Sequence, residues 1–166
     1  MHFPRLSCLL ATLTIGGLAL AACGTPGGES PFPPFPGLES KPTTIPPRYT
    51  PEEIVGRWGV ASYQRDADRA RTEAAARRQC SKPYTITKGA GGGVMMHLAD
   101  QATPVELRIK TAADGKTYIG PEGEPGGAQD REVVSFDGRV MVLRYTDPEA
   151  AGRYGTMIYV RCAPRA

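Results

Sequence analysis

Short runs of strand-forming residues follow one another along most of this 166-residue chain, and they restrict the fold more than any other feature. Residues 105–110 alternate strictly between apolar and charged side chains, as in a strand with one buried and one wet face. Turn signals separate the runs at hairpin-length spacing, among them Asp137-Gly138 and Asp147-Pro148. The strand-like runs are 55–63, 84–88, 94–99, 105–110, 117–120, 131–136, 140–146 and 154–162. We therefore predict a mainly β fold, a small antiparallel up-and-down β-barrel of about eight strands, because closure removes both exposed sheet edges.

One α-helix is expected between the first two strands. Residues 66–79 begin with aspartates and end with arginines, which suits the two ends of the helix dipole. The apolar face of this helix consists of Ala67, Ala70 and Ala74, which are small enough to allow close packing on another element. Its arginine-rich face is interpreted either as solvated or as a contact for an anionic membrane surface or partner.

The N-terminal 22 residues have the pattern of a signal peptide. Arg5 precedes an apolar run that ends at Ala22, shorter than the roughly 20 residues of a membrane-spanning helix. The tetrapeptide Leu20-Ala21-Ala22-Cys23 resembles the lipobox of bacterial lipoproteins. This resemblance implies a lipoprotein signal peptide over 1–22, a lipid thioether on Cys23 and acylation of the new terminus, for example with palmitate. A plain secretory signal is the alternative.

The lipid anchor, if present, determines the expected location of the protein in the cell. Gly24 stands where an aspartate would resemble an inner-membrane retention signal, so we expect anchoring in the outer membrane, facing the periplasm. The expected partner through this lipid is the membrane itself. Residues 23–49, rich in proline and glycine, are expected to form a flexible linker to a domain over 50–166. A proline-rich ligand for an aromatic groove is the less favoured interpretation of this segment.

Two cysteines, Cys80 and Cys162, lie within the expected barrel domain. An exported chain folds in an oxidising compartment, so a single disulfide between them is the natural prediction. A metal or redox pair is disfavoured, because the chain has no Cys-x-x-Cys and only one histidine, His97, beyond the signal peptide.

Catalytic and nucleic-acid-binding functions find little support in the residues. No G-x-S-x-G elbow accompanies His97, and the glycine run 89–93 lacks the ending of a phosphate-binding loop. The net charge of +3 comes without a dense basic block, so no nucleic-acid partner is expected. We expect no enzymatic activity, no catalytic residue, no metal and no cofactor.

The barrel sequence resembles the lipocalins and the wider calycin group. In those families a Gly-x-Trp follows a helical turn, a Thr-Asp pair lies in a later strand connection, and a basic residue covers the tryptophan. The matching residues, expected to form a barrel-floor motif, are Gly56, Trp58, Thr146, Asp147 and Arg161. Residues expected to face the interior, and possible ligand-lining positions, are Val60, Ile86, Met96, Leu98, Leu107, Ile109, Val142 and Ile158. Filling a solid barrel is their alternative role.

Three functions stay open from the sequence. The first is a non-catalytic binding or envelope-interaction module, with an envelope protein as partner. The second is a lipocalin-like carrier of a small apolar ligand. The third is a protease inhibitor of the small calycin-like barrel type, in which the segment before the barrel would enter the protease cleft. The sequence does not indicate an oligomeric state.

Overall fold

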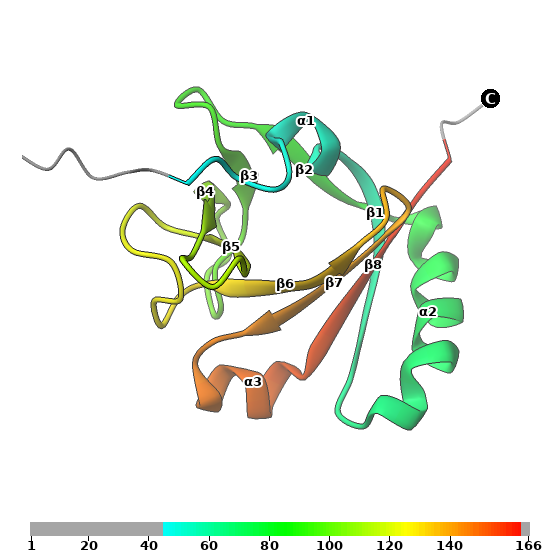
Figure 1. Cartoon of the computed structure of the whole chain (residues 1–166). Coiled ribbons are helices and arrows are strands. Elements are labelled where there is room, and N and C mark those ends of the chain that lie inside the picture. The colour runs from blue at the N-terminus through cyan, green and yellow to red at the C-terminus, as the bar shows by residue number, and fades with distance from the viewer. Residues whose placement is uncertain (1–44, 164–166) are drawn as a thin grey trace, which may run out of the picture. The chain divides into compact units, whose positions relative to one another are not determined.

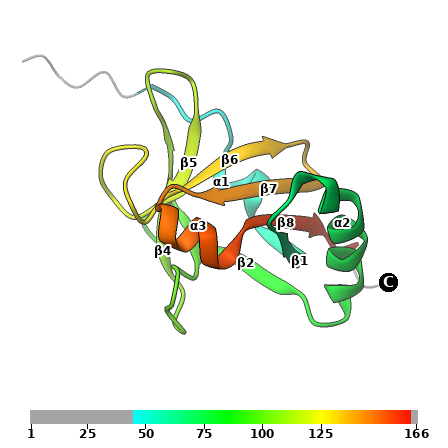
Figure 2. The ribbon, with the colours of Figure 1, turned by 90° about the horizontal axis from the view of Figure 1, so that it is seen from below.

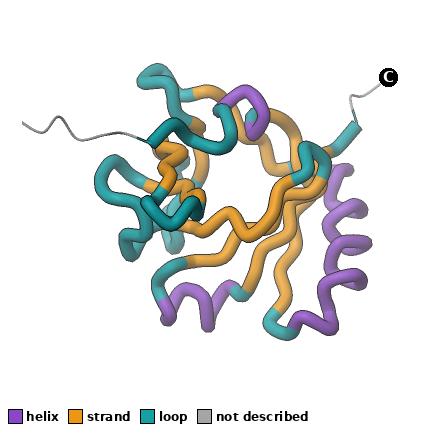
Figure 3. The backbone as a smooth tube through the Cα atoms, viewed as in Figure 1, coloured by secondary structure: helices purple, strands orange, loops and turns teal. Residues whose placement is uncertain are grey.

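Eight antiparallel strands form a closed barrel in the computed structural model, which describes residues 45–163. The strands are β1 (Gly56–Tyr63), β2 (Tyr84–Lys88), β3 (Val94–Met96), β4 (Val105–Thr111), β5 (Thr117–Gly120), β6 (Arg131–Phe136), β7 (Val140–Tyr145) and β8 (Thr156–Arg161). Each strand pairs with its sequence neighbour, and β8 pairs with β1 from Trp58–Arg161 to Tyr63–Thr156. Figure 3 shows the strands as a ring with the helices outside it. The predicted up-and-down barrel is confirmed.

The helices and turns lie at the barrel ends and on one outer face. They are α1 (Pro51–Ile54), α2 (Arg69–Arg78), α3 (Pro148–Tyr154) and the 3₁₀ turns η1 (Asp66–Asp68) and η2 (Gln79–Ser81). The expected helix over 66–79 thus corresponds to η1, α2 and the start of η2. Within residues 45–163 no helix has the length and apolar character needed to cross a membrane.

Most of the barrel interior is filled by apolar side chains. Trp58 is fully buried, and its ring lies edge-on to Phe136 and Tyr159. The buried residues of this cluster are Ile54, Trp58, Ile86, Val94, Met96, Leu107, Ile119, Val133, Met141, Leu143 and Tyr159. A filled interior is what a small barrel requires, because dispersion contacts are lost at any void.

A second apolar cluster lies outside the barrel, between the sheet and α2. Figure 1 shows α2 running alongside β1 and β8. Val142 and Ile158 pack here together with Ala76 of α2, so the expectation that they line the interior is wrong. The reason is that β7 and β8 carry apolar side chains on both faces, and their alternation therefore does not show which face is inside.

Gly59 allows α2 to approach this closely. A Cβ atom built at Gly59 would lie 1.9 Å from the Ala76 carbonyl oxygen, so any side chain there would push the helix away. The packed face of α2 contains Thr72 and Ala76, both buried. The expected packing face was wrong, since Ala67, Ala70 and Ala74 are exposed to solvent.

The connection between β7 and β8 was mistaken for a turn. Asp147 accepts a hydrogen bond from the Ala150 amide at 2.8 Å, and Pro148 occupies the first position of α3. Proline at this position loses no helical hydrogen bond, and aspartate is a favoured N-cap. Figure 2 shows α3 at the end of the barrel where β7 leads into β8.

The predicted disulfide joins the end of the α2 region to the end of β8. Cys80 and Cys162 are bonded, with their Cα atoms 5.6 Å apart. Ahead of the barrel, Thr50 and Glu53 form a capping box that begins α1. Tyr49, in the segment expected to be linker, lies edge-on to Phe136 at 5.2 Å, so barrel packing begins before residue 50. The signal peptide, Cys23 and the linker up to residue 44 lie outside the described residues.

Candidate functional site

One end of the barrel, called here the Trp58 end, is closed by contacts within the chain. The Arg161 guanidinium lies 4.2 Å from the centre of the Trp58 ring. Its nitrogens donate to the carbonyl oxygens of Gly138 at 2.7 Å, Val55 at 3.0 Å and Glu53. Trp58 itself donates from Nε1 to the Ile54 carbonyl at 2.9 Å. Every one of these contacts is internal, and together they connect α1, β1, β8 and the turn between β6 and β7.

The expected barrel-floor motif is divided between the two ends. Gly56 lies beside Arg161 at the Trp58 end. Along the β7–β8 ladder, Val140 pairs with Val160, next to Arg161, whereas Arg144 pairs with Thr156 at the other end. Thr146 and Asp147 follow β7 and therefore lie at the end opposite Trp58. Their placement in the floor was wrong, because the motif gives sequence order and not the direction of each strand.

The opposite end, called here the mouth, contains a cavity of about 160 Å³. β1 beyond Trp58 has no partner on its β2 side, since β2 begins at Tyr84, directly opposite Trp58. Side chains from six segments line the cavity instead of a continuous sheet. They are Val60, Tyr84, His97, Leu98, Arg131, Tyr145, Met157 and Tyr159.

Two of the predicted ligand-lining residues, Val60 and Leu98, border this cavity. Four others belong to the packed interior or contact it. Ile86, Met96 and Leu107 are fully buried in the core, and Ile109 is half-buried against it. The structure thus brings only part of the predicted set to one place.

Arg131 is the chemically distinctive residue of the mouth. It pairs with Tyr145 across the β6–β7 ladder and is only 2% exposed. One terminal nitrogen donates to the His97 carbonyl oxygen, and the guanidinium lies 4.9 Å from the centre of the Tyr145 ring. Its Nε has no hydrogen-bond partner among residues 45–163. A buried donor without a partner is rare in native proteins and calls for a water or a ligand atom.

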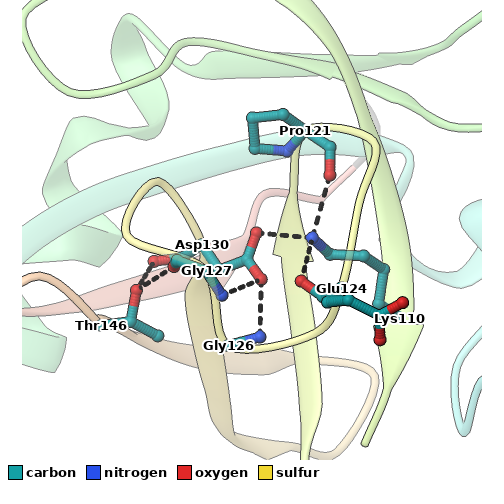
Figure 4. A network of polar contacts seen from close by, with 7 residues as sticks. All are labelled: Lys110, Pro121, Glu124, Gly126, Gly127, Asp130 and Thr146. Atoms are coloured by element: carbon teal, nitrogen blue, oxygen red, sulfur yellow. Dashed lines mark hydrogen bonds and ion pairs between the residues drawn. The ribbon is translucent and has the colours of Figure 1, made fainter. Parts of the chain in front are cut away.

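The neighbouring acid, Asp130, does not balance the charge of Arg131. Asp130 faces away from the interior and bonds Lys110 Nζ at 2.8 Å and the amides of Gly126 and Gly127 at 2.8 and 3.0 Å. Figure 4 shows this network, in which Thr146 also donates to the Gly127 and Asp130 carbonyls. These bonds hold the start of β6 in place, and the role of Thr146 is to take part in them. Among the ion pairs of the described residues, none includes Arg131.

Tyrosine side chains line the cavity together with Arg131. Tyr84 accepts a hydrogen bond from the His97 amide at 3.0 Å, and its oxygen lies 3.2 Å from His97 Nδ1. Within the part of the chain described, the Tyr159 hydroxyl contacts only the Met157 sulfur, at 3.9 Å. Burial raises the pKa of both Tyr84 and Tyr159. Both hydroxyls therefore stay protonated at neutral pH and can donate.

The loop that follows β3 forms one side of the mouth and is tied to α3. The Asp100 carboxylate pairs with Arg153 at 3.0 Å and accepts a bond from the Tyr154 hydroxyl. Asp100 has a positive φ of 60°, a conformation that aspartate tolerates better than most residues. This link holds His97 and Leu98 beside the cavity, although it is itself exposed to solvent.

Sequence reasoning missed most of the cavity residues, namely Tyr84, Arg131, Tyr145, Met157 and Tyr159. A signal for Arg131 exists: it stands two residues before Val133, so the strand period places it on the same interior face. A charged residue on an apolar face is the pattern that indicates a site. No group of three or more potential metal ligands occurs in the described part of the chain.

Comparisons of the chain with models of protein families, with curated proteins and with solved structures find no match.

Proposed function

We propose that this chain is a lipid-anchored envelope protein whose barrel is a non-catalytic binding module, with a small ligand held in the mouth. The observation that carries the proposal is the cavity of about 160 Å³ lined by Arg131, a buried cation with an unpartnered donor. A packing role alone gives no reason for a charge at this position, because an isolated buried ion costs several kcal/mol.

The proposed location in the cell rests on residues 20–23 and on the disulfide. The lipobox-like LAAC supports a lipoprotein anchored in the outer membrane and facing the periplasm. A disulfide between Cys80 and Cys162 is consistent with an oxidising compartment. Both observations favour the periplasmic side of the inner membrane.

The lipocalin-like carrier, second of the three functions left open by the sequence, is therefore the form of binding module that we favour. The arginine over Trp58 supports a lipocalin-like closed end, and a ligand cavity at the opposite end agrees with that architecture. The position of Thr146 and Asp147 argues for a distant likeness rather than close membership. Drug-sized ligands fill roughly 300–1,000 Å³, so this cavity suits a small molecule or one end of a longer one.

An envelope-interaction module is a second candidate, favoured by a charged groove on the outer surface. The groove, of about 350 Å³, lies between α2 and the β7–β8 strands. Its charged lining residues are Arg69, Glu73, Arg77, Asp137, Arg139 and Arg161. Crosslinking in the native host with Arg69 and Arg77 both changed to Ala separates this candidate from the carrier. Loss of a crosslinked partner supports the groove, and an unchanged pattern removes it. The protease-inhibitor alternative depends on residues 24–49, of which 24–44 lie outside the described part. Deletion of 24–49 should abolish inhibition if this alternative is correct.

Native mass spectrometry of the protein purified from its host tests the carrier directly. We expect a co-purifying small molecule that is lost when Tyr145 and Leu98 are both replaced by larger or charged side chains. A protein that is always ligand-free, and that binds no apolar probe, would contradict the proposal. Mass spectrometry of the N-terminal peptide tests the anchor, since Cys23→Ser should release the chain from the membrane fraction.

A further inference from the structure

Arg131 brings a positive charge into the barrel, and the described residues give it only partial compensation. Its contacts are the His97 carbonyl, a partial negative charge, and the π face of Tyr145. The nearest acid in sequence, Asp130, is already neutralised by Lys110 on the other face of the strand. A charge of this kind favours an external partner of opposite sign, because removing a cation from water is repaid mainly by an anion.

We propose that the mouth binds a small organic anion, a carboxylate on a short apolar body, and that Arg131 is the residue that holds its charged group. This inference rests on the proposed function, that the mouth holds a ligand, and adds the chemical class of that ligand.

The polar groups of the cavity fit a carboxylate. A guanidinium is planar and carries several donors in one plane, so it can donate two parallel bonds to the two oxygens of a carboxylate. The Tyr159 hydroxyl is bonded only to a sulfur, which is a weak acceptor, and it is therefore ready to turn toward a carboxylate oxygen. No described carboxylate lines the cavity, so nothing there repels an anion.

The remaining lining indicates the body of the ligand. Val60, Leu98 and Met157 are apolar, and the Tyr84 and Tyr145 rings provide flat surfaces. Such a lining recognises an alkyl or aromatic group next to the carboxylate, and it disfavours a heavily hydroxylated or phosphorylated ligand. The volume of about 160 Å³ admits a single small ring or a short chain, with any further length emerging at the mouth.

Matched pairs of probes test separately the need for a carboxylate charge on the ligand and the preferred shape of its apolar part. We would measure binding of benzoate against benzamide and of hexanoate against hexanol by titration calorimetry, on the full-length chain in a non-ionic detergent. We expect at least one carboxylate to bind, with its neutral counterpart weaker by roughly tenfold or more, as for loss of a charge-assisted hydrogen bond. Preference for benzoate indicates an aromatic acid, and preference for hexanoate a fatty-acid-like ligand.

Variants test whether Arg131 is the residue that contacts the carboxylate. Arg131→Met should weaken carboxylate binding by roughly tenfold or more and leave the neutral probes unchanged. Arg144→Met, which removes an exposed arginine paired with Glu132 at 2.8 Å on the outer face of the barrel, should bind like the unmodified chain. In the unmodified chain, the ¹⁵N signal of the Arg131 Nε should shift when the carboxylate is added, which requires no variant to fold.

The outcomes separate this inference from the proposed function. If benzamide and hexanol bind as well as the acids, or if the Arg131 signal does not move, the anion assignment is wrong although the mouth still binds ligands. If none of the four probes binds, both the assignment and the proposed carrier function fail.

Discussion

Two arginines lie over aromatic rings at the two ends of the same barrel, and they differ in how their donors are used. Arg161, over Trp58, donates to three backbone carbonyls that belong to α1, to the residue after it and to the β6–β7 turn. Arg131, near Tyr145, donates to one carbonyl and keeps a buried Nε without a partner. The cation–π contact is thus common to both ends, and the hydrogen bonding is not.

The difference supports a structural role for the Trp58 end and is the basis of the ligand-binding role proposed for the mouth. Arg161 uses its Nε and both terminal nitrogens on carbonyls of the chain, and it connects elements that are distant in sequence, across more than 100 residues to Glu53 and Val55. An arginine with an unfilled donor destabilises the empty barrel and is stabilised when an anion arrives. Natural proteins retain such local conflicts mainly at functional sites.

The largest expected effect concerns the disulfide, which reinforces the Trp58 end. The Cys162 amide donates to the Arg57 carbonyl at 2.8 Å, so the bond lies directly beside the Trp58–Arg161 pair. Replacing both Cys80 and Cys162 by Ala should lower the free energy of unfolding by about 4 kcal/mol, because the bond closes a loop of 82 residues. Urea denaturation measures this change.

The link at the mouth provides the matched control. Asp100→Asn breaks the exposed pair with Arg153, and it should lower the free energy of unfolding by less than about 1 kcal/mol. If the Asp100 variant costs as much stability as the loss of the disulfide, the mouth is as structural as the Trp58 end and the comparison fails.

The next largest change in stability is expected from replacing the two arginines. Arg161→Met should destabilise the fold by about 2–4 kcal/mol, because several charge-assisted hydrogen bonds and a cation–π contact are lost together. Arg131→Met should change stability by less than about 1 kcal/mol, or increase it, because it removes an incompletely paired buried charge. Thermal and urea unfolding of both variants, without added ligand, measures the contrast. Equal losses would show that Arg131 is a structural residue.

The sequence predicts the barrel better than it predicts the site. Strand number, order and closure follow from alternating segments joined by hairpin-length loops. Each strand lies within two residues of its expected range except β3, which ends three residues early, at Met96. The missed α3 has a local cause, since Asp147-Pro148 is both a turn signal and the start of a helix.

Which side chains of a strand point into the barrel was harder to predict where both faces of the strand are apolar. Met141, Val142 and Leu143 are consecutive apolar residues, and only the position of α2 decides that Val142 lies outside. The position of α2 depends in turn on the close approach that Gly59 permits, which no helix pattern reveals. The site depends on the same information, because the cavity combines residues from six segments whose inward faces must all be known.

The smallest effect is at high pH and comes from the mouth alone. Burial raises the pKa of Tyr159 above its ordinary value of about 10. Above about pH 10 the unfolded chain loses the Tyr159 proton while the folded chain keeps it, so the free energy of unfolding falls as pH rises. The slope contributed by this group is at most about 1.4 kcal/mol per pH unit.

Tyr159→Phe removes that contribution, and its hydroxyl has only a weak sulfur partner to lose. We therefore expect the variant to match the unmodified chain in stability near pH 7 and to exceed it at pH 11, as measured by urea denaturation at both values. If Tyr159→Phe is no more stable at pH 11, the hydroxyl is not held away from water, and the mouth is open enough to solvate Arg131 without a ligand.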